Sequence, residues 1–563
     1  MGIFFGGNKF LPAMLTAGFT VVASLAAGPS IQAATNISGS SAQSAQVNCI
    51  NAYAKIPSNN YLNYAPAIGS PEVSDAIHSG LQPCATFADG VTGSTRKFQV
   101  AQYLSPTVYP GQIQLVIQGG PDAAFLVGGA PGTPIPSYSG GPYVARFNPA
   151  TGAQIWRTAL PQLPGQWVAA PSGAVVKGGW VDVVVGPTVY KLDPKSGAIV
   201  ASVQQPVLAG AAVDANFDGF AVAPDSNGTI LLKSQNRSAG CPTQGNQAMS
   251  MCIAKYGPQP VTTVIAVDPV TLKNIAAITL NQAVASRPTV VAHGSVTQMY
   301  LAGSTQGVRV LWNPQTKTLS QDLSWAPPLL LPGQSAGDAP VPLGNWVVFN
   351  NNAVAPTSGV PICAFVVNMT DASKTQRLCP WGTTIPAGVS SNAPASFSTD
   401  PQKSLIFMQD LLVGGVFAVH LNQTNGQMAI KWSRPDWRTS DYFSVTGPAN
   451  HRVLASQYMS PSFTASQIST NSWTESVLWV DEDTGKTLAQ SAFNGPTDLG
   501  WYAMPGYSGR WYTLSAAGTI NIYVPQSCAK SGKKPVAPAS ITMCSTNYAS
   551  LPAPVRNPAL LAK

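Results

Sequence analysis

The densest run of metal-ligand residue types lies between residues 214 and 225. Oxygen-bearing side chains stand at its first, third, fifth and twelfth positions, and glycine stands at its sixth, as in a calcium loop of the EF-hand type. Carboxylates replace water around a hard cation, and glycine permits the sharp bend of such a loop. The last ligand departs from the motif, because Asp replaces the bidentate Glu. The ligands of this calcium site would be Asp214, Asn216, Asp218 and Asp225.

A β-hairpin is the competing interpretation of the same segment. Phe220 and Val222 alternate on one strand, residues 224–228 have turn composition, and apolar residues alternate again on the next strand. We favour the hairpin, because the flanks lack a helical pattern. The hairpin places Asp225 at the opposite end of a strand from Asp214. The four residues are therefore metal candidates only on the condition that the loop forms.

A second candidate site follows Trp432, where aromatic residues alternate with Arg and Asp. Trp437, Arg438 and Asp441 are candidates for binding a saccharide or a peptide, because flat rings cover apolar faces while polar groups fix orientation. Asp436 and Asp441 form a candidate hydrolase pair. The structural alternative is a core tryptophan followed by a connecting loop. We favour it for Trp432 and leave the other residues open.

Other reactive residue types show no useful spacing. The histidines, at positions 78, 293, 420 and 451, lack metal-ligand spacing, and no Gly-x-Ser-x-Gly elbow is present. The formal charge is only +8, and the basic residues are scattered. Nucleic-acid binding would need clustered Lys and Arg, so it is not expected.

The elements that must position these candidates come from a repeated pattern. An apolar run is followed by an anchoring Asn or Asp, a turn and a second strand, and two further short strands precede most copies. The chain is 45% apolar and 9% charged and has 51 Gly and 49 Pro, which suits short strands joined by tight turns. Such repeats are typical of four-stranded propeller blades. The anchors are Asn148, Asp193, Asp268, Asn313, Asn368, Asn422 and Asp481.

The two ends of the repeat region predict how the ring closes. Residues 501–504, 510–514 and 519–524 supply three strands, and residues 98–104 are an unpaired strand that supplies the fourth. Combining both ends in one blade removes an exposed sheet edge. We therefore predict an all-β fold, a β-propeller of eight blades, with seven as the alternative.

The amino-terminal residues predict export. Lys9 precedes an apolar stretch at 10–28, and Ala33 ends a small-residue cleavage site, so residues 1–33 are a predicted signal peptide. An uncleaved membrane anchor is the alternative. A short extension at 34–96 then precedes the propeller at 97–525 and a tail at 526–563. No transmembrane span is expected after signal removal, and the predicted location is periplasmic or extracellular.

Cysteine usage agrees with an oxidising compartment. Sequence alone does not select a connectivity. Local pairing is the simplest, and reduced structural thiols are the alternative. The predicted pairs are Cys49 with Cys84, Cys241 with Cys252, Cys363 with Cys379, and Cys528 with Cys544.

The first repeat, from Asn148 through Thr151 and Gly152 to Trp156, resembles the tryptophan-docking repeat of the quinoprotein-like propellers, which include enzymes that use pyrroloquinoline quinone (PQQ). The copy that ends at Trp432 is looser. The resemblance implies the fold, while function must come from a site. Dehydrogenases of this superfamily commonly carry a vicinal Cys pair under the quinone, and this sequence has neither such a pair nor a Cys-x-x-Cys-His haem motif. The sugar-dehydrogenase branch, which need not have the Cys pair, stays open.

We predict an exported, non-catalytic binding or assembly scaffold whose partner is a protein or a saccharide. The alternative is a quinoprotein-like oxidoreductase or a carbohydrate-active enzyme that uses the central channel of the propeller. No cofactor is expected apart from the conditional calcium, and PQQ is not expected.

Overall fold

The computed structural model describes residues 48–50, 63–64, most of 79–527, and 555–556. Outside the description within 79–527 lie residues 86–97, 112–114, 121, 130–139, 162–171, 212–215, 239–259, 285, 333, 354–360, 383–396, 440–441, 451, 465, 468–471 and 497–502. The predictions for the signal peptide at 1–33, for Cys241 with Cys252 and for Cys528 with Cys544 fall outside the described residues.

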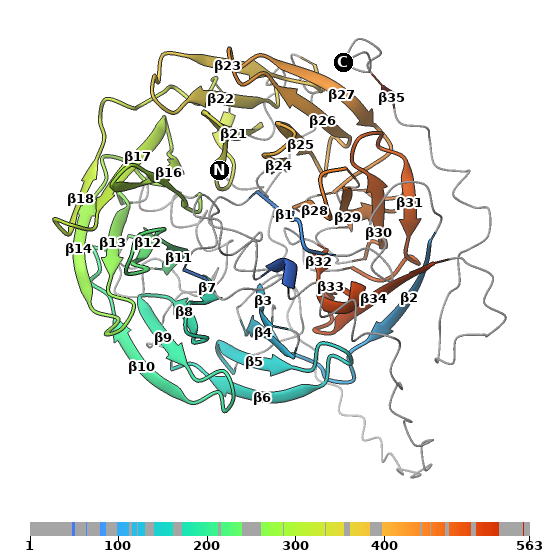
Figure 1. Ribbon diagram of the computed structural model, residues 1–563, viewed down its shortest axis with the longest axis horizontal. Coiled ribbons are helices and arrows are strands. Elements are labelled where there is room, and N and C mark those ends of the chain that lie inside the picture. The colour runs from blue at the N-terminus through green and yellow to red at the C-terminus, as the bar shows by residue number, and fades with distance from the viewer. Residues whose placement is uncertain are drawn as a thin grey trace, which may run out of the picture.

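The described strands form a ring of eight blades, each an antiparallel sheet that runs outward from the centre (Figure 1). The all-β prediction and the count of eight are thus confirmed. Blades 1 to 4 consist of β3 (Leu115–Gly120), β4 (Ala123–Gly128), β5 (Tyr143–Phe147), β6 (Gln154–Ala159); β7 (Ser172–Val175), β8 (Val181–Val185), β9 (Thr188–Leu192), β10 (Ile199–Gln204); β11 (Asn216–Val222), β12 (Ile230–Gln235), β13 (Thr263–Val267), β14 (Asn274–Thr279); and β15 (Thr289–His293), β16 (Val296–Ala302), β17 (Gly307–Asn313), β18 (Thr318–Gln321). Blades 5 to 8 consist of β19 (Gln334–Ala336), β20 (Val341–Leu343), β21 (Trp346–Ala353), β22 (Ala364–Asn368), β23 (Thr375–Leu378); β24 (Ser398–Asp400), β25 (Leu405–Gln409), β26 (Val416–Leu421), β27 (Met428–Arg434); β28 (Ser444–Thr446), β29 (Val453–Met459), β30 (Glu475–Asp481), β31 (Thr487–Gln490); and β32 (Met504–Pro505), β33 (Trp511–Leu514), β34 (Ile520–Ser527), β2 (Phe98–Leu104).

Three short elements stand outside this scheme. The strand β1 (Leu81–Gln82) lies inside blade 7, and β35 (Val555–Arg556) lies outside blade 6. A 3-10 helix, η1 (Tyr507–Gly509), connects β32 to β33.

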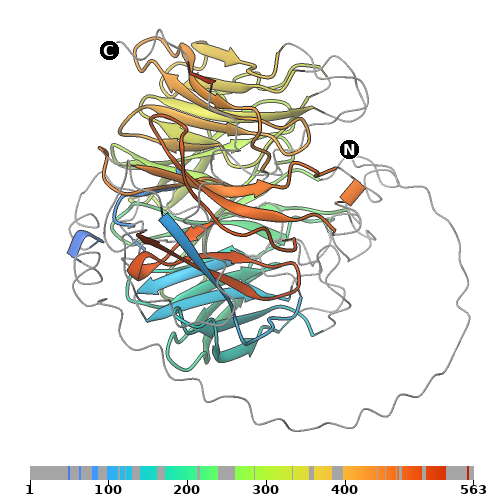
Figure 2. The same ribbon diagram turned by 90° about the vertical axis from the view of Figure 1, so that its right-hand side faces the viewer.

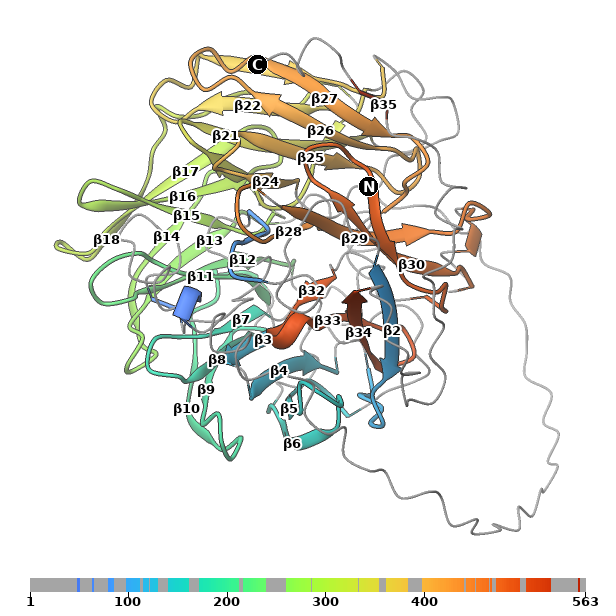
Figure 3. The same ribbon diagram turned by 45° about the vertical axis from the view of Figure 1, so that its right-hand side comes forward.

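The ring closes through blade 8, as the sequence predicts. The strand β2 pairs antiparallel with β34 along its whole length, from Phe98 opposite Ser527 to Leu104 opposite Asn521. Figure 3 shows β2 beside β34 at the outer side of the ring. The chain therefore completes its last blade with a strand from near its beginning, which covers the outer edge of β34.

Burial within a blade explains the sequence pattern. Middle strands such as β8 and β13 are buried at every position, because both faces of the sheet pack against neighbouring blades. The outermost strand β10 instead alternates between half-buried and exposed residues, because one of its faces meets solvent. Apolar runs thus mark the inner strands, and alternation marks the outer ones.

The anchors form the turns predicted for them. Asp193 is typical: one carboxylate oxygen accepts hydrogen bonds from the backbone N–H of Lys195 (2.9 Å) and of Ser196 (2.7 Å). The same bonding to residues two or three positions on recurs at all seven anchors. Such side-chain-to-backbone bonds fix a turn locally.

Most anchor turns also join their blade to the one before it. The carbonyl of the residue after the anchor accepts a hydrogen bond from a side chain of the preceding blade. The donor–acceptor pairs are Trp156 with Pro194 (3.3 Å), Lys191 with Pro269, Trp346 with Gln423 (3.0 Å), Trp432 with Glu482 (2.7 Å) and Tyr512 with Pro149 (2.7 Å). The expected docking role of Trp432 is confirmed.

One anchor turn contains a correctable strain. Four residues after Asn313, Lys317 is exposed and has φ 54°, where the matching residue of four other repeats is glycine, as at Gly426 with φ 75°. A side chain disfavours this left-handed conformation, whereas glycine adopts it freely. We expect Lys317→Gly to raise the free energy of unfolding by about 0.5–1 kcal/mol in urea denaturation. Gln315→Gly, in the same turn without a positive φ, should lower it; stabilisation by both substitutions would contradict the explanation.

The two ends of the ring differ in character. In each antiparallel blade, the first and third connections lie at one end and the others lie at the opposite end. We call the end with the anchor turns the turn face and the opposite end the loop face. Long connections such as 322–333 and 460–474 belong to the loop face.

Two of the four predicted disulfides fall on described residues, and both are present. Cys49 is bonded to Cys84, and Cys363 is bonded to Cys379 across the hairpin of β22 and β23. The local pairing is confirmed for these two.

Candidate functional site

In the face-on view of Figure 1, the described parts of the N-terminal extension lie toward the middle of the ring. Residues 79–85, which we call the strap, place β1 parallel to β28 of blade 7, with Leu81 opposite Val445. Residues that follow the strap's strand reach blade 8, where Cys84 and Ala85 pack with Ile50 and Tyr507 in a buried cluster. In the edge-on view of Figure 2, the short blue helical segment at 48–50 protrudes from one side of the disc.

A second part of the extension meets blades 2 and 3. The side-chain amide of Asn63 donates to the carbonyls of Ala223 and Asp225, both at 2.7 Å. The Tyr64 hydroxyl accepts from the backbone N–H of Val222 at 2.8 Å. Because these contacts lie beside the connection from β11 to β12, this part of the extension lies at the turn face. The extension therefore joins blades on opposite sides of the ring.

A half-buried carboxylate, Asp338, connects blades across the interior of the ring. Asp338 of blade 5 accepts hydrogen bonds from the Tyr442 hydroxyl (2.6 Å) and from the Arg287 backbone N–H (3.1 Å), and the Arg287 guanidinium lies 3.3 Å away. Tyr442 precedes blade 7 and is fully buried, while Arg287 precedes blade 4. The carboxylate is thus held as an anion by groups from two other blades.

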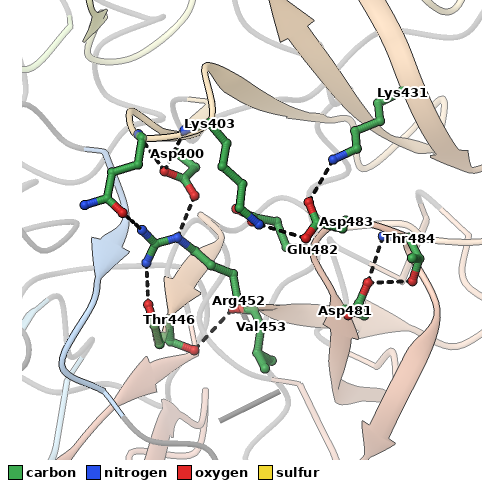
Figure 4. Close-up of polar contacts among 12 residues, drawn as sticks. Asp400, Lys403, Lys431, Thr446, Arg452, Val453, Asp481, Glu482, Asp483 and Thr484 are labelled. Carbon is green, nitrogen blue, oxygen red and sulfur yellow. Dashed lines mark hydrogen bonds and ion pairs between the residues drawn. The ribbon is translucent and has the colours of Figure 1, made fainter. Parts of the chain in front are cut away.

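Charged residues concentrate at the seam between blades 6 and 7 (Figure 4). These charged residues, which we call the seam cluster, range from buried to exposed. Asp400, Arg452 and Glu482 have no exposed side-chain surface, whereas the side chain of Asp483 is 45% exposed. The seam cluster comprises Asp400, Lys403, Lys431, Arg452, Glu482 and Asp483.

Arg452 links the cluster to the strap. Its Nε lies 2.5 Å from an Asp400 carboxylate oxygen, and its terminal nitrogens donate to the Gln402 side chain and to the Gly447 carbonyl. The backbone N–H of Gly447 in turn donates to Gln82 of the strap at 3.2 Å. The buried ion pair is therefore linked through one residue, Gly447, to the strap.

The outer half of the cluster is a ladder of alternating charge. Lys403 Nζ lies 2.7 Å from Glu482 and 2.8 Å from Asp483, and Lys431 Nζ lies 2.8 Å from Asp483. Burial alone would raise the pKa of Asp483, but the hydrogen bonds from Lys403 and Lys431 outweigh it and hold the pKa below its usual value. Burial alone would lower the pKa of Lys403, but its two acidic partners, Glu482 and Asp483, outweigh burial and raise that pKa above its usual value.

Glu482 behaves differently from its neighbour. Burial, reinforced by the negative charge of Asp400, raises the pKa of Glu482 to about 8 despite the nearby Lys403 and Arg452. Burial also raises the pKa of Asp182, on β8 in blade 2, to about 7, although Lys191 Nζ lies 3.8 Å away. Both carboxyl groups therefore hold protons in the folded protein at pH values where the unfolded chain has lost them.

These shifts determine how stability depends on pH. Between the unfolded pKa near 4.5 and the folded value of about 8, folded Glu482 binds more protons than unfolded Glu482, so stability falls as pH rises. The slope reaches at most about 1.4 kcal/mol per pH unit for one proton.

We expect Glu482→Gln to flatten the decline in unfolding free energy between pH 5 and pH 8. Asp122→Asn, an exposed control, should leave the decline unchanged; parallel curves for all three proteins would contradict the assignment.

The ligand residues predicted after Trp432 are mainly structural. Trp437 is fully buried, packs edge-on against Phe443 and donates its indole N–H to the Gln457 carbonyl at 2.5 Å. Arg438 donates to the Leu412 carbonyl at 2.6 Å. These contacts engage both residues in positioning the connections of blades 6 and 7, so Trp437 presents no ring to a ligand.

The proposed hydrolase pair is only partly described. Asp436 lies against Arg434 with two hydrogen bonds of 2.8 and 2.7 Å, and the Arg434 side chain is buried. Asp441 lies outside the described residues. This two-pronged contact with Arg434 shows Asp436 engaged within its own connection.

The favoured hairpin is present at the calcium candidate. The strands β11 and β12 pair antiparallel from Asn216 opposite Gln235 to Val222 opposite Ile230. Asp225 follows in the turn, where one oxygen accepts three backbone N–H bonds and the other accepts from Trp312. Asp214 and the side chains of Asn216 and Asp218 lie outside the description, so calcium binding stays a prediction.

The histidines and other metal-ligand types add no site in the described part of the chain. His293 and His420 are exposed on different blades, and His78 and His451 lie outside the description. Among the described residues, no group of three or more His, Cys, Asp or Glu side chains is arranged to hold a metal ion.

The seam cluster was missed by sequence reasoning. Five of its members stand in or beside three separate turns, each of which alone resembles an ordinary solvated loop, and Lys431 stands on β27. One usable signal was available: the chain is only 9% charged, yet residues 481–483 place three acids together beside an anchor.

Comparison with solved structures finds matches at low sequence identity. The solved structures similar to this chain include BamB from Moraxella catarrhalis, at 14% identity and a TM-score of 0.35, covering 79% of this chain and 96% of that one. They also include the quinohemoprotein alcohol dehydrogenases ADHIIG from Pseudomonas putida HK5 (11% identity, TM-score 0.47, covering 87% and 83%) and that from Comamonas testosteroni (11%, 0.45, covering 88% and 85%). Likeness at this level extends to the propeller architecture alone.

No protein-family model matches the chain, and no curated protein sequence matches it. Over the described residues, no helix has the length and apolar character needed to cross a bilayer.

Proposed function

We propose that the protein is an exported, non-catalytic scaffold that holds a protein partner on the loop face of the ring. The observation that carries the proposal is the placement of the N-terminal extension at the turn face and along the inner edge of blade 7, where it contacts blades 2, 3, 7 and 8. This placement leaves the loop face, with its long connections, as the surface for a partner. The two disulfides support export, because such bonds persist in oxidising compartments.

A protein partner is favoured over a saccharide. Trp437, the ring expected to stack on a saccharide, is fully buried. The loop face presents exposed apolar side chains, which suit a protein partner. Leu323 is 66% and Leu331 is 37% exposed in the connection from blade 4 to blade 5, and Phe493 is 45% exposed in the connection from blade 7 to blade 8. An enzyme that bound its substrate in the central channel would have to do so beside the strap and beside Asp338 with its hydrogen bonds to Tyr442 and Arg287.

Photo-crosslinking in the cells that make the protein tests this function. A benzophenone amino acid replaces Leu323 or Leu331 on the loop face, and Val270, which is 77% exposed in an anchor turn, is the matched turn-face position. We expect the same partner protein to be crosslinked from both loop-face positions and not from Val270. Adducts from Val270 alone, or from no position, would overturn the proposal.

A further inference from the structure

Blade 7 differs from the other blades at its inner edge. The strand β1 belongs to none of the eight four-stranded blades, yet it pairs with β28, the innermost strand of blade 7, in parallel. Among the described strands, no other strand from outside the blades pairs with an innermost strand. Antiparallel pairing joins all the consecutive strands within the blades, so the pairing of β1 with β28 is of a different kind. An extended segment that adds to a sheet edge in this way is a known mode of peptide recognition.

The strap is held by its backbone from two blades at once. Thr399 of blade 6 donates its backbone N–H to the Ser79 carbonyl at 2.7 Å. Val445, on β28, donates to the Gly80 carbonyl at 2.9 Å. The Gly447 bond to Gln82 extends the series, so three strap carbonyls accept from the ring. Such main-chain bonds supply affinity that does not depend on side chains.

The side chains of the strap add selectivity. A Cβ on Gly80 would lie 2.3 Å from the Phe443 carbonyl oxygen, and Gly80 has φ 76°, so only glycine fits there. Leu81 is 4% exposed and packs in the cluster that contains Phe407 and Phe443. Ser79 before the glycine is fully buried, and Gln82 after the leucine is 1% exposed. The edge therefore accommodates a small polar residue, glycine, a large apolar residue and a polar residue, in that order.

We propose that the inner edge of blade 7, formed by Phe443–Gly447, together with Ser398–Thr399 of blade 6, is a peptide-binding edge whose ligand this chain supplies in cis as residues 79–82. The partner that fits in trans is an extended peptide segment with the same order of residues. Tethering gives the cis segment an effective concentration in the millimolar range, so an added peptide binds only when the strap has left the edge. The proposal goes beyond the loop-face function, because it concerns the ring interior and a different ligand.

Peptide binding to a variant with a displaced strap tests the proposal. The probe is a fluorescent peptide of residues 77–83, and the displaced form is the full chain carrying Gly80→Ala. Gly210→Ala is the matched control, because Gly210 has φ 81° and nothing within 4 Å of an added Cβ. We expect fluorescence anisotropy to show binding to the Gly80→Ala chain at least about ten-fold tighter than to the wild-type or Gly210→Ala chain. A peptide that itself carries Gly80→Ala should not bind; equal binding of both peptides, or none to the displaced form, would overturn the proposal.

Hydrogen exchange in the unmodified chain keeps the proposal testable if Gly80→Ala fails to fold. We expect the N–H groups of Val445 and Gly447, which donate to the strap, to exchange at least about ten-fold faster than those in the middle of β29 and β30, because the strap opens separately from the blade. If the N–H groups of Val445 and Gly447 exchanged at the same rate as those in the middle of β29 and β30, the strap would be a permanent strand of the blade. The proposal would then fail.

Discussion

Replacement of Phe98–Leu104 by a Gly-Ser linker of equal length is expected to abolish the cooperative unfolding transition of the propeller. The seven residues pair with β34 along the strand, and Val100 and Ala101 are buried. Losing this ladder and the buried side chains costs on the order of 5 kcal/mol or more, which is comparable to the whole stability of a typical domain. The linker also leaves β34 as an open edge, so aggregation is expected.

Soluble yield and a circular dichroism melt measure this effect. The control replaces Val555–Arg556, a strand added outside the four strands of blade 6, with Gly and Ser. That variant should melt within a few degrees of the unmodified protein, because blade 6 keeps its four strands. A soluble variant of the closing strand with an unchanged melt would refute the closure of the ring through β2.

Arg452→Met is expected to lower the free energy of unfolding by about 3–5 kcal/mol, because it leaves Asp400 as a buried carboxylate without its cationic partner. Neither side chain of the pair is exposed, and Arg452 also donates to Gln402 and Gly447. The comparison is Lys374→Met at the exposed Lys374–Asp371 pair, whose side chains are 68% and 42% exposed. Loss of an exposed pair should cost less than about 1 kcal/mol.

Urea denaturation of a double-mutant cycle checks the assignment. Combining Arg452→Met with Asp400→Leu removes both charges, so much of the loss should be recovered. Equal destabilisation by Arg452→Met and Lys374→Met would show that the seam contributes no special stability. Additive effects of the two seam substitutions would show that Arg452 and Asp400 are not coupled.

The blade framework was predictable because its signals are local. Each anchor, such as Asp193, fixes its turn through bonds to residues two or three positions on, and the adjacent apolar runs mark inner strands. Closure by residues 98–104 was predictable for a related reason, because the last blade lacked one strand and one unpaired strand remained. Both inferences need composition and turn chemistry, without any knowledge of distant contacts.

The interior of the ring was not predictable in the same way. The paired part of the strap is only two residues long, which is too short to show a period, and its partner strand is far along the chain. Arg452 and Asp400 likewise come from different blades, and nothing near either residue marks it as buried. Trp437 shows the opposite error, since a tryptophan beside Arg and Asp resembles a ligand platform although its ring is fully buried.

Titration of the purified protein with PQQ and Ca²⁺, followed by a dye-reduction assay with alcohols and sugars, tests most directly whether the protein is a scaffold without catalysis. The account predicts no stoichiometric uptake of the quinone by absorbance and no substrate-dependent reduction of the dye. Stoichiometric quinone uptake with dye reduction that depends on an added alcohol or sugar would contradict the account and would establish the enzyme instead.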